Sequence, residues 1–188
     1  MRTKRFVAGF YEGILEAKRR FPDTQLHILY AGTGPFGTLM LPMTTLFSPH
    51  EIKFTLLEIN RHSIECLKNT ISSFEAWEYI EEIVETDASQ YEAREDQAFH
   101  MLITETMQRA LKKEPHVSIT LNLIDQIEEN GVLIPENVIV DAVLFDSRRN
   151  MDRMFGDIDA KKDYYKLLGR VLEFDKSTAI KEADAFRA

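Results

Sequence analysis

The stretch ILYAGTGPFG, residues 28–37, joins an apolar run to a helical pattern through three glycines. Gly32, Gly34 and Gly37 form the pattern G-x-G-x-x-G. Because glycine lacks a Cβ atom, a ligand can approach this backbone closely and accept hydrogen bonds from its N–H groups. The same pattern also occurs at tight turns between a strand and a helix. By itself the motif therefore indicates either a ligand-binding loop or a structural turn.

Glu58 ends a second apolar run, FTLLE, roughly 20–25 residues beyond the glycines. A carboxylate in this position can accept hydrogen bonds from both hydroxyls of a ribose. An acid at the same place can also complement the dipole of the helix that follows. The glycine loop upstream favours the ribose, so loop, strand and acid together predict a nucleoside-binding site.

Asp87 follows a third apolar run, in the stretch VETDASQY. Its carboxylate could accept a hydrogen bond from the exocyclic amine of adenine, with the backbone of Ala88 beside it. Aspartate is also a common turn residue, because its side chain bonds to nearby backbone. The sequence leaves both interpretations of Asp87 open.

Glu105 comes directly after a fourth apolar run, and Glu114 follows it nine positions later in TETMQRALKKE. An acid at the carboxyl end of a strand points toward the crevice in which open α/β sheets bind ligands. NAD would need its pyrophosphate seated at the glycine loop. S-adenosylmethionine carries a sulfonium and an amino-acid end instead, and these favour carboxylates. Glu105 is an acid at the place where the ligand would lie, and the residues alone leave the nucleoside open between these two.

Strand and helix patterns alternate along the chain, which is typical of a parallel sheet covered by helices on both faces. Apolar residues recur at helical spacing from Phe6 to Arg20. Asn60 or Ser63 is expected to cap a helix that begins there, and Gly131 to end a later one. Expected strands cover residues 25–31, 52–60, 81–91 and 98–105, expected helices residues 38–47, 63–74 and 116–129, and an extended stretch residues 132–145.

The predicted fold class is therefore α/β: a Rossmann-like, mostly parallel sheet flanked by helices, with a helical C-terminal extension. Residues 1–24 are expected to form an N-terminal helix and residues 25–145 the cofactor-binding core. Residues 146–188 are charged and helix-biased, which predicts a helical extension or tail.

Composition excludes several classes of protein. The 188 residues carry 31 acids against 23 bases, a net charge of -8, which argues against non-specific binding to nucleic acid. No apolar run approaches the roughly 18 residues of a membrane span. Glu12 and Glu16 interrupt the N-terminal stretch, so no signal peptide is expected. The single cysteine, Cys66, excludes an intramolecular disulfide and fits a reducing, cytoplasmic compartment.

The order of the motifs resembles the class I S-adenosylmethionine-dependent methyltransferases, and within them it is most similar to the core of the protein arginine methyltransferases. The resemblance covers about residues 25–145. It rests on ILYAGTGP, LLEIN, VETDAS, LITETMQRALKKE and IEENGVLIPENVIVDAVL. It implies S-adenosylmethionine as cofactor and no metal. The implied cofactor-binding residues are Ala31, Gly32, Thr33, Gly34, Glu58, Ile59, Asp87, Ala88 and Glu105.

In that family two glutamates nine positions apart form a hairpin, so the resemblance implies catalytic roles for Glu105 and Glu114. A planar guanidinium pairs bidentately with carboxylates, so two glutamates could hold it against the methyl sulfonium. This chain departs from the pattern in three ways. Tyr30 replaces an acid, the hairpin is rich in bases such as Arg109, and no C-terminal β-barrel is expected. The methyl acceptor stays open between a protein arginine and a small molecule with an N or O nucleophile.

Two other functions compete with a methyltransferase. The first is a non-catalytic pseudo-methyltransferase or partner-binding module, which the altered hairpin favours. The second is an NAD-type oxidoreductase, which is disfavoured because no general acid or base is obvious. The five histidines are scattered, and each is more simply explained as a surface or packed side chain. A methyltransferase is also compatible with a homo-oligomer. No nucleic-acid or membrane partner is expected.

Overall fold

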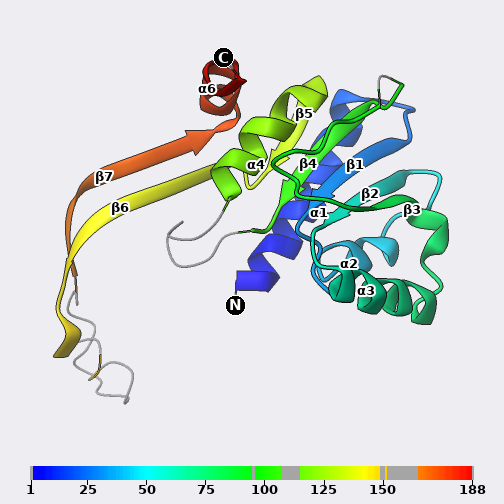
Figure 1. Ribbon diagram of the computed structural model, residues 1–188, viewed down its shortest axis with the longest axis horizontal. Helices are drawn as coiled ribbons and strands as arrows, with labels where there is room; N and C mark the ends of the chain where they lie inside the picture. The colour runs from blue at the N-terminus through cyan, green and yellow to red at the C-terminus, as the bar shows by residue number, and fades with distance from the viewer. Residues whose placement is uncertain (1, 95, 107–114, 149–150, 152–164, 188) are drawn as a thin grey trace. The chain divides into compact units, whose positions relative to one another are not determined.

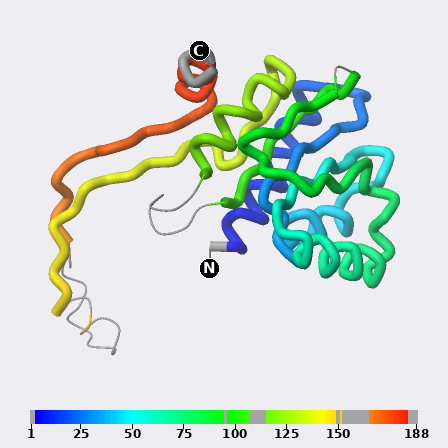
Figure 2. Tube along the Cα trace, in the orientation of Figure 1, coloured from blue at the N-terminus to red at the C-terminus, as the bar shows by residue number. Residues whose placement is uncertain are grey.

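The computed structural model describes residues 2–94, 96–106, 115–148, 151 and 165–187 (Figure 2). The chain divides into two compact units. The larger unit consists of residues 1–136 and 176–188, and the smaller of residues 137–175. The expected core boundary at residue 145 therefore lies inside the smaller unit rather than at its edge.

A five-stranded sheet forms the centre of the larger unit, in the order β3-β2-β1-β4-β5 (Figure 1). Every neighbouring pair of strands in this sheet is parallel, as predicted. β1 pairs with both β2 and β4. From β1, the strands β2 and β3 follow in one direction across the sheet and β4 and β5 in the other, so the strand order reverses at β1. Ligands of open α/β sheets bind at the carboxyl ends of strands at such a reversal. The strands are β1 Leu26–Ala31, β2 Ile52–Glu58, β3 Ile80–Glu85, β4 Phe99–Thr104 and β5 Ile127–Ile134.

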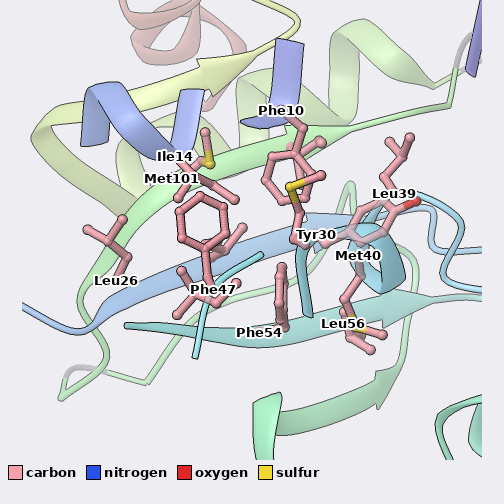
Figure 3. Packing of buried hydrophobic residues seen from close by; sticks show 14 of the residues in the cluster. Phe10, Ile14, Leu26, Tyr30, Leu39, Met40, Phe47, Phe54, Leu56 and Met101 are labelled. Carbon is pink, nitrogen blue, oxygen red and sulfur yellow. The ribbon is translucent and has the colours of Figure 1, made fainter. Parts of the chain in front are cut away.

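Helices cover both faces of this sheet. Alternate side chains of β1, such as Ile28 and Tyr30, join one core cluster with residues of α1 and α2. In that cluster the ring of Phe10 meets Phe54 edge to face at 6.2 Å between centroids (Figure 3). Side chains of the opposite parity, such as Leu29, are buried outside this cluster, on the face where α4 contacts β4. The helices are α1 Arg2–Arg20, α2 Met40–Thr44, α3 Arg61–Ser73, α4 His116–Leu123 and α6 Lys176–Arg187, with short 3-10 turns η1 Trp77–Tyr79 and η2 Ile124–Gln126.

The cap of α3 is confirmed as Asn60. Its side-chain oxygen accepts hydrogen bonds from the backbone N–H groups of His62 at 2.9 Å and Ser63 at 3.1 Å. This contact begins the helix at the residue directly after the tip of β2.

The expected role of Gly131 is wrong. The helix ends at Leu123 and Gly131 lies within β5. The pairing of β4 with β5 shifts between Phe99 and Met101, so a bulge absorbs residues 128–131. A Cβ atom on Gly131 would lie 2.8 Å from the carbonyl oxygen of Glu128, and the glycine is therefore required by close backbone packing rather than by a helix end.

The expected helical extension is only partly correct, because α6 is a helix but residues 165–175 form a strand. β6, Asn137–Phe145, and β7, Tyr165–Asp175, pair as an antiparallel two-stranded ribbon. Val138 lies opposite Phe174, and Asp141 forms an ion pair with its cross-strand partner Arg170 at 3.3 Å. Cross-strand pairing therefore overrides the local helical tendency of β7. Among the described residues, no helix has the length and apolar character that crossing a membrane would require.

Candidate functional site

The glycine loop passes close to the end of β4. Gly32 and Gly34 have φ angles of +79° and +61°, which favour glycine. The N–H of Gly32 donates to the carbonyl oxygen of Leu57 at 3.0 Å, which ties the loop to β2. A Cβ atom on Gly32 would lie 2.6 Å from the Cγ2 of Thr106. The first glycine is therefore needed for close packing between the ends of β1 and β4.

Glu58 lies directly against this loop. Its Oε2 accepts a hydrogen bond from the N–H of Gly34 at 2.9 Å, and its Oε1 accepts one from Asn60 at 2.9 Å. The residue is only 9% exposed. A carboxylate offers about four lone-pair positions, so these two contacts leave capacity for further donors. Ile59 beside it is 65% exposed.

Asp87 takes part in a turn. Its Oδ1 accepts hydrogen bonds from both the N–H and the hydroxyl of Ser89, at 2.9 and 2.8 Å. The backbone of the residue before it donates to the carbonyl oxygen of Glu58 at 3.1 Å, so the ends of β2 and β3 lie side by side. Ala88 is buried, and its carbonyl oxygen accepts a hydrogen bond from Asn122 at 3.1 Å. The contacts of Asp87 with Ser89 therefore support its interpretation as a turn residue.

A small cavity of about 190 Å³ opens beside the glycine loop. It is lined by the ends of β1 and β4, the loop itself and the first turns of α1. This volume is smaller than the roughly 300–1,000 Å³ of pockets that enclose a whole ligand. The lining residues include Phe6, Tyr30, Gly32, Thr33, Gly34, Leu39 and Glu105.

Two features of the loop suit a bound ligand. Thr33 is only 3% exposed, and its hydroxyl oxygen has no hydrogen-bond partner. A buried polar group without a partner is uncommon in native proteins. The position where a Cβ atom of Gly34 would stand has no other atom within 4 Å. The loop therefore leaves open space beside Gly34 and an unsatisfied hydroxyl at the neighbouring residue.

Tyr30 provides a neutral hydroxyl at the cavity. Burial raises the pKa of this hydroxyl far above its ordinary value. The nearby carboxylate of Glu105 raises that pKa further, and a hydrogen bond with the backbone of Leu39 opposes the shift. Tyr30 therefore keeps its proton at physiological pH.

His116 was not singled out by sequence reasoning, which described it only as a surface or packed histidine. It is 1% exposed, and its Nδ1 lies 3.1 Å from the hydroxyl of Thr104 and 3.3 Å from that of Thr106. Burial lowers its pKa to about 4, so the ring is neutral at pH 7. These two threonines flank Glu105 in the sequence, and no local pattern links them to His116, because the contact depends on how the chain folds.

The structure describes one of the two glutamates of the expected hairpin. Glu105 lines the cavity, and its N–H donates to the carbonyl oxygen of Ala31 at 3.4 Å. Glu114 lies outside the described residues, as does Arg109. In the described part of the chain, no three His, Cys, Asp or Glu side chains are grouped in a way that could hold a metal ion.

No protein-family profile matches the sequence, and no curated protein matches it significantly. Solved structures do share its fold. The Trypanosoma brucei PRMT1 enzyme–prozyme heterotetrameric complex with AdoHcy aligns over 98% of this chain and 61% of that one, with a TM-score of 0.66 and 13% identity. Protein arginine methyltransferase 10 of Arabidopsis thaliana aligns over 77% and 40%, with a TM-score of 0.54 and 15% identity.

An S-adenosylmethionine-dependent methyltransferase from Clostridium acetobutylicum aligns over 74% of this chain and 50% of that one, with a TM-score of 0.52 and 11% identity. The chain thus spans from 40% to 61% of the length of these three proteins. The sheet order, the glycine loop and the acid at the tip of β2 agree with this likeness. The protein therefore has the fold of the class I S-adenosylmethionine-dependent methyltransferases, and its core is similar to that of the protein arginine methyltransferases.

Proposed function

We propose that the protein is an S-adenosylmethionine-dependent methyltransferase. The observation that carries this proposal is the contact of Glu58 with Gly34, directly beside a cavity that contains an unsatisfied hydroxyl. A ribose at this point would donate its hydroxyls to the remaining lone pairs of Glu58. The AdoHcy bound in the Trypanosoma brucei complex supports the choice of nucleoside.

The other expected cofactor contacts follow from the neighbouring strand ends. Asp87 and Ala88 lie beyond β3, next to Glu58 through the backbone contact between the strands. Adenine in this position would lie beside the exposed side chain of Ile59. Asp87 would keep its turn contacts and use its second oxygen for the exocyclic amine.

Methyl transfer would take place at the end of β4. The cofactor supplies a methyl group on a sulfonium, and alignment of the acceptor with that methyl is the main source of rate. Glu105 lies at the cavity wall, where its carboxylate can orient a nucleophile. A guanidinium held between Glu105 and Glu114 is one candidate acceptor, since carboxylates pair with it bidentately. A small molecule with an N or O nucleophile is the other.

A second candidate function, partner binding without catalysis, is favoured by the ribbon of β6 and β7. A two-stranded ribbon alone is marginally stable in water. Many of its large apolar side chains are nevertheless exposed, which is typical of an interaction surface. These exposed side chains are Ile139, Val143, Leu144, Phe145, Tyr165, Leu167, Leu168 and Val171. Assembly with a second copy of the chain would cover them, and the heterotetrameric state of the Trypanosoma brucei complex is consistent with such assembly.

Titration calorimetry with S-adenosylmethionine, S-adenosylhomocysteine and NAD tests the proposed function. We expect both adenosyl amino acids to bind with a stoichiometry of one, and NAD to produce no heat above dilution. Binding of NAD alone would favour the oxidoreductase. If none of the three binds, the partner-binding candidate replaces the methyltransferase.

A further inference from the structure

A larger groove runs along α1 on the side of the helix that packs against β5. Its volume of about 690 Å³ lies within the roughly 300–1,000 Å³ of pockets that enclose a ligand. Phe6 is the one described residue that lines both this groove and the cavity beside the glycine loop. The groove is therefore a separate candidate site.

Two glycines of α1 shape the groove. A Cβ atom on Gly13 would lie 2.5 Å from the Cε of Met101 and 3.1 Å from the Cδ1 of Ile134, so the helix lies close to β4 and β5 at this turn. One turn earlier, the Cβ position of Gly9 has open space around it within the described part of the chain. Gly9 lines the groove together with the apolar residues Val132, Leu133, Ile134 and Pro135. The middle of the groove is therefore an apolar slot.

Positive charge gathers where α1 ends. Arg19, Arg20 and Lys176 line the groove there, and Glu16 is the acid beside them among the described lining residues. Glu16 forms ion pairs with both arginines, at 2.8 Å to the Nε of Arg20. One carboxylate therefore serves two guanidinium groups, and the ammonium of Lys176 adds a third positive charge.

The contacts of Arg20 and Lys176 place both cations on one short stretch of backbone. The Nη1 of Arg20 donates to the carbonyl oxygen of Asn130 at 3.1 Å. The Nζ of Lys176 donates to the carbonyl oxygens of Glu129 at 2.8 Å and Gly131 at 2.6 Å. A guanidinium has five N–H donors and an ammonium three, so these contacts saturate neither side chain.

The two charges also disfavour one another. Burial lowers the pKa of Lys176, the nearby charge of Arg20 lowers it further, and Glu129 opposes the shift. An anion bound between the two cations would reduce this repulsion and accept their remaining hydrogen bonds.

The opposite end of the groove has the opposite sign. The described charged residues that line it toward the start of α1 are Arg5, Glu12 and Glu136, and acids outnumber bases among them. An α-helix rises about 1.5 Å per residue, so Gly9 and Arg20 lie roughly 16 Å apart along the helix axis. The groove therefore presents an apolar slot whose charge changes sign along its length.

We propose that this groove binds an elongated apolar molecule with an anionic head. The apolar chain lies along Gly9 and β5, and the head lies at Arg20 and Lys176. A carboxylate and a phosphate suit these donors equally, because both accept charge-assisted hydrogen bonds from guanidinium and ammonium groups. The inference does not rest on the proposed function, since the cofactor cavity takes no part in it.

Calorimetry with three probes of equal chain length tests the chemistry of the ligand. Decanoate, decyl phosphate and decyltrimethylammonium are titrated into the wild type below their micelle concentrations. We expect an anionic probe to bind with a stoichiometry of one, and the tighter of the two to identify the head group. The cationic probe should bind at least tenfold more weakly. Equal binding of the cationic probe, or binding of neither anion, would overturn the inference.

Filling the groove tests its location. Gly9→Leu places a side chain in the open space beside Gly9, so it should weaken the anionic probe at least tenfold. Ala8→Leu is the matched control, because Ala8 is an exposed neighbour on the same helix that does not line the groove. It should leave the affinity within about twofold. Leucine is a better helix former than glycine, so the unfolding midpoint of Gly9→Leu should not fall. Wild-type affinity in Gly9→Leu would show that the probe binds elsewhere.

Removing single charges tests the position of the head. Arg20→Gln and Lys176→Gln should each weaken the anionic probe roughly three- to tenfold, since both cations are partly exposed to solvent. Lys18→Gln is the control: Lys18 belongs to the same helix and is paired with Glu51, but it does not line the groove. S-adenosylhomocysteine should bind every variant as it binds the wild type, which separates this site from the cofactor site. Unchanged probe affinity in both Arg20→Gln and Lys176→Gln would refute the proposal.

Discussion

The carboxylate of Glu58 lies 2.9 Å from the backbone N–H of Gly34, although 24 residues separate them in sequence. One short contact thus joins the tip of β2 to the loop after β1. The same side chain also accepts a hydrogen bond from the backbone N–H of Asn60, the residue that caps α3. Glu58 therefore holds together the backbone that would surround a ribose, in addition to its expected contact with the ribose hydroxyls.

Substitutions of Glu58 should separate these two roles. Glu58→Ala removes the acceptor of two backbone N–H groups, so we expect a loss of about 1–3 kcal/mol in unfolding free energy. Glu58→Gln retains one acceptor oxygen and should lose less stability. Both should weaken S-adenosylhomocysteine at least tenfold, measured by calorimetry below the unfolding midpoint. Full affinity in Glu58→Gln would exclude a ribose contact through the charged carboxylate.

His116 should make the protein sensitive to acid. Its pKa is about 4 in the folded protein and 6.5 in the unfolded chain, so the unfolded chain binds more protons between these values. The contribution of neutral His116 to the free energy of unfolding is therefore fully present above pH 6.5. It is lost as the pH drops toward 4, by up to about 3 kcal/mol.

Urea unfolding at pH 7 and pH 4.5 measures this loss. Burial also lowers the pKa of His27 and His100, so the variant His116→Gln must be compared with the wild type at both pH values. The variant should lose less stability on acidification than the wild type. His62→Gln is the control, because the His62 side chain is 85% exposed. An identical pH dependence in wild type and His116→Gln would contradict the assignment.

Two glycines should respond to alanine with opposite signs. A Cβ atom on Gly131 would meet two backbone carbonyl oxygens, at 2.8 and 3.2 Å, so Gly131→Ala should destabilise the protein by about 1–3 kcal/mol. Gly9 lies within α1 and has no atom within 4 Å of its Cβ position. Gly9→Ala should stabilise by about 0.5–1 kcal/mol. Chemical denaturation of both variants measures the difference, and equal effects would refute the packing argument for β5.

The ribbon of β6 and β7 should promote self-association. Leu144 and Leu168 are each 63% exposed, and replacing both with glutamate should shift the protein toward a monomer in sedimentation velocity at micromolar concentration. Phe74→Glu, at a side chain that is 66% exposed beside α3, serves as the control. A wild type that is already monomeric would show that the ribbon does not bind a second copy.

Local patterns in the sequence determined much of the larger unit. The first four strands, the helix that begins after Asn60 and the glycine loop were all predicted at or near their observed places. Periodicity, caps and turns act over a few residues, so they can be recognised without knowledge of the fold. The approach of the strand tips to one another followed from the parallel order, because parallel strands end at one edge of the sheet.

The tertiary structure alone decided the features that depend on distant partners. Gly131 lies within a strand because β4 pairs with the residues of β5 on either side of the bulge that contains it, and β7 is a strand because β6 pairs with it. The burial of His116 depends on contacts with Thr104 and Thr106 of the neighbouring segment. The Thr33 hydroxyl is buried without a hydrogen-bond partner because of how the surrounding chain packs around it. Burial and pairing between remote segments set these outcomes, and no short stretch of sequence contains them.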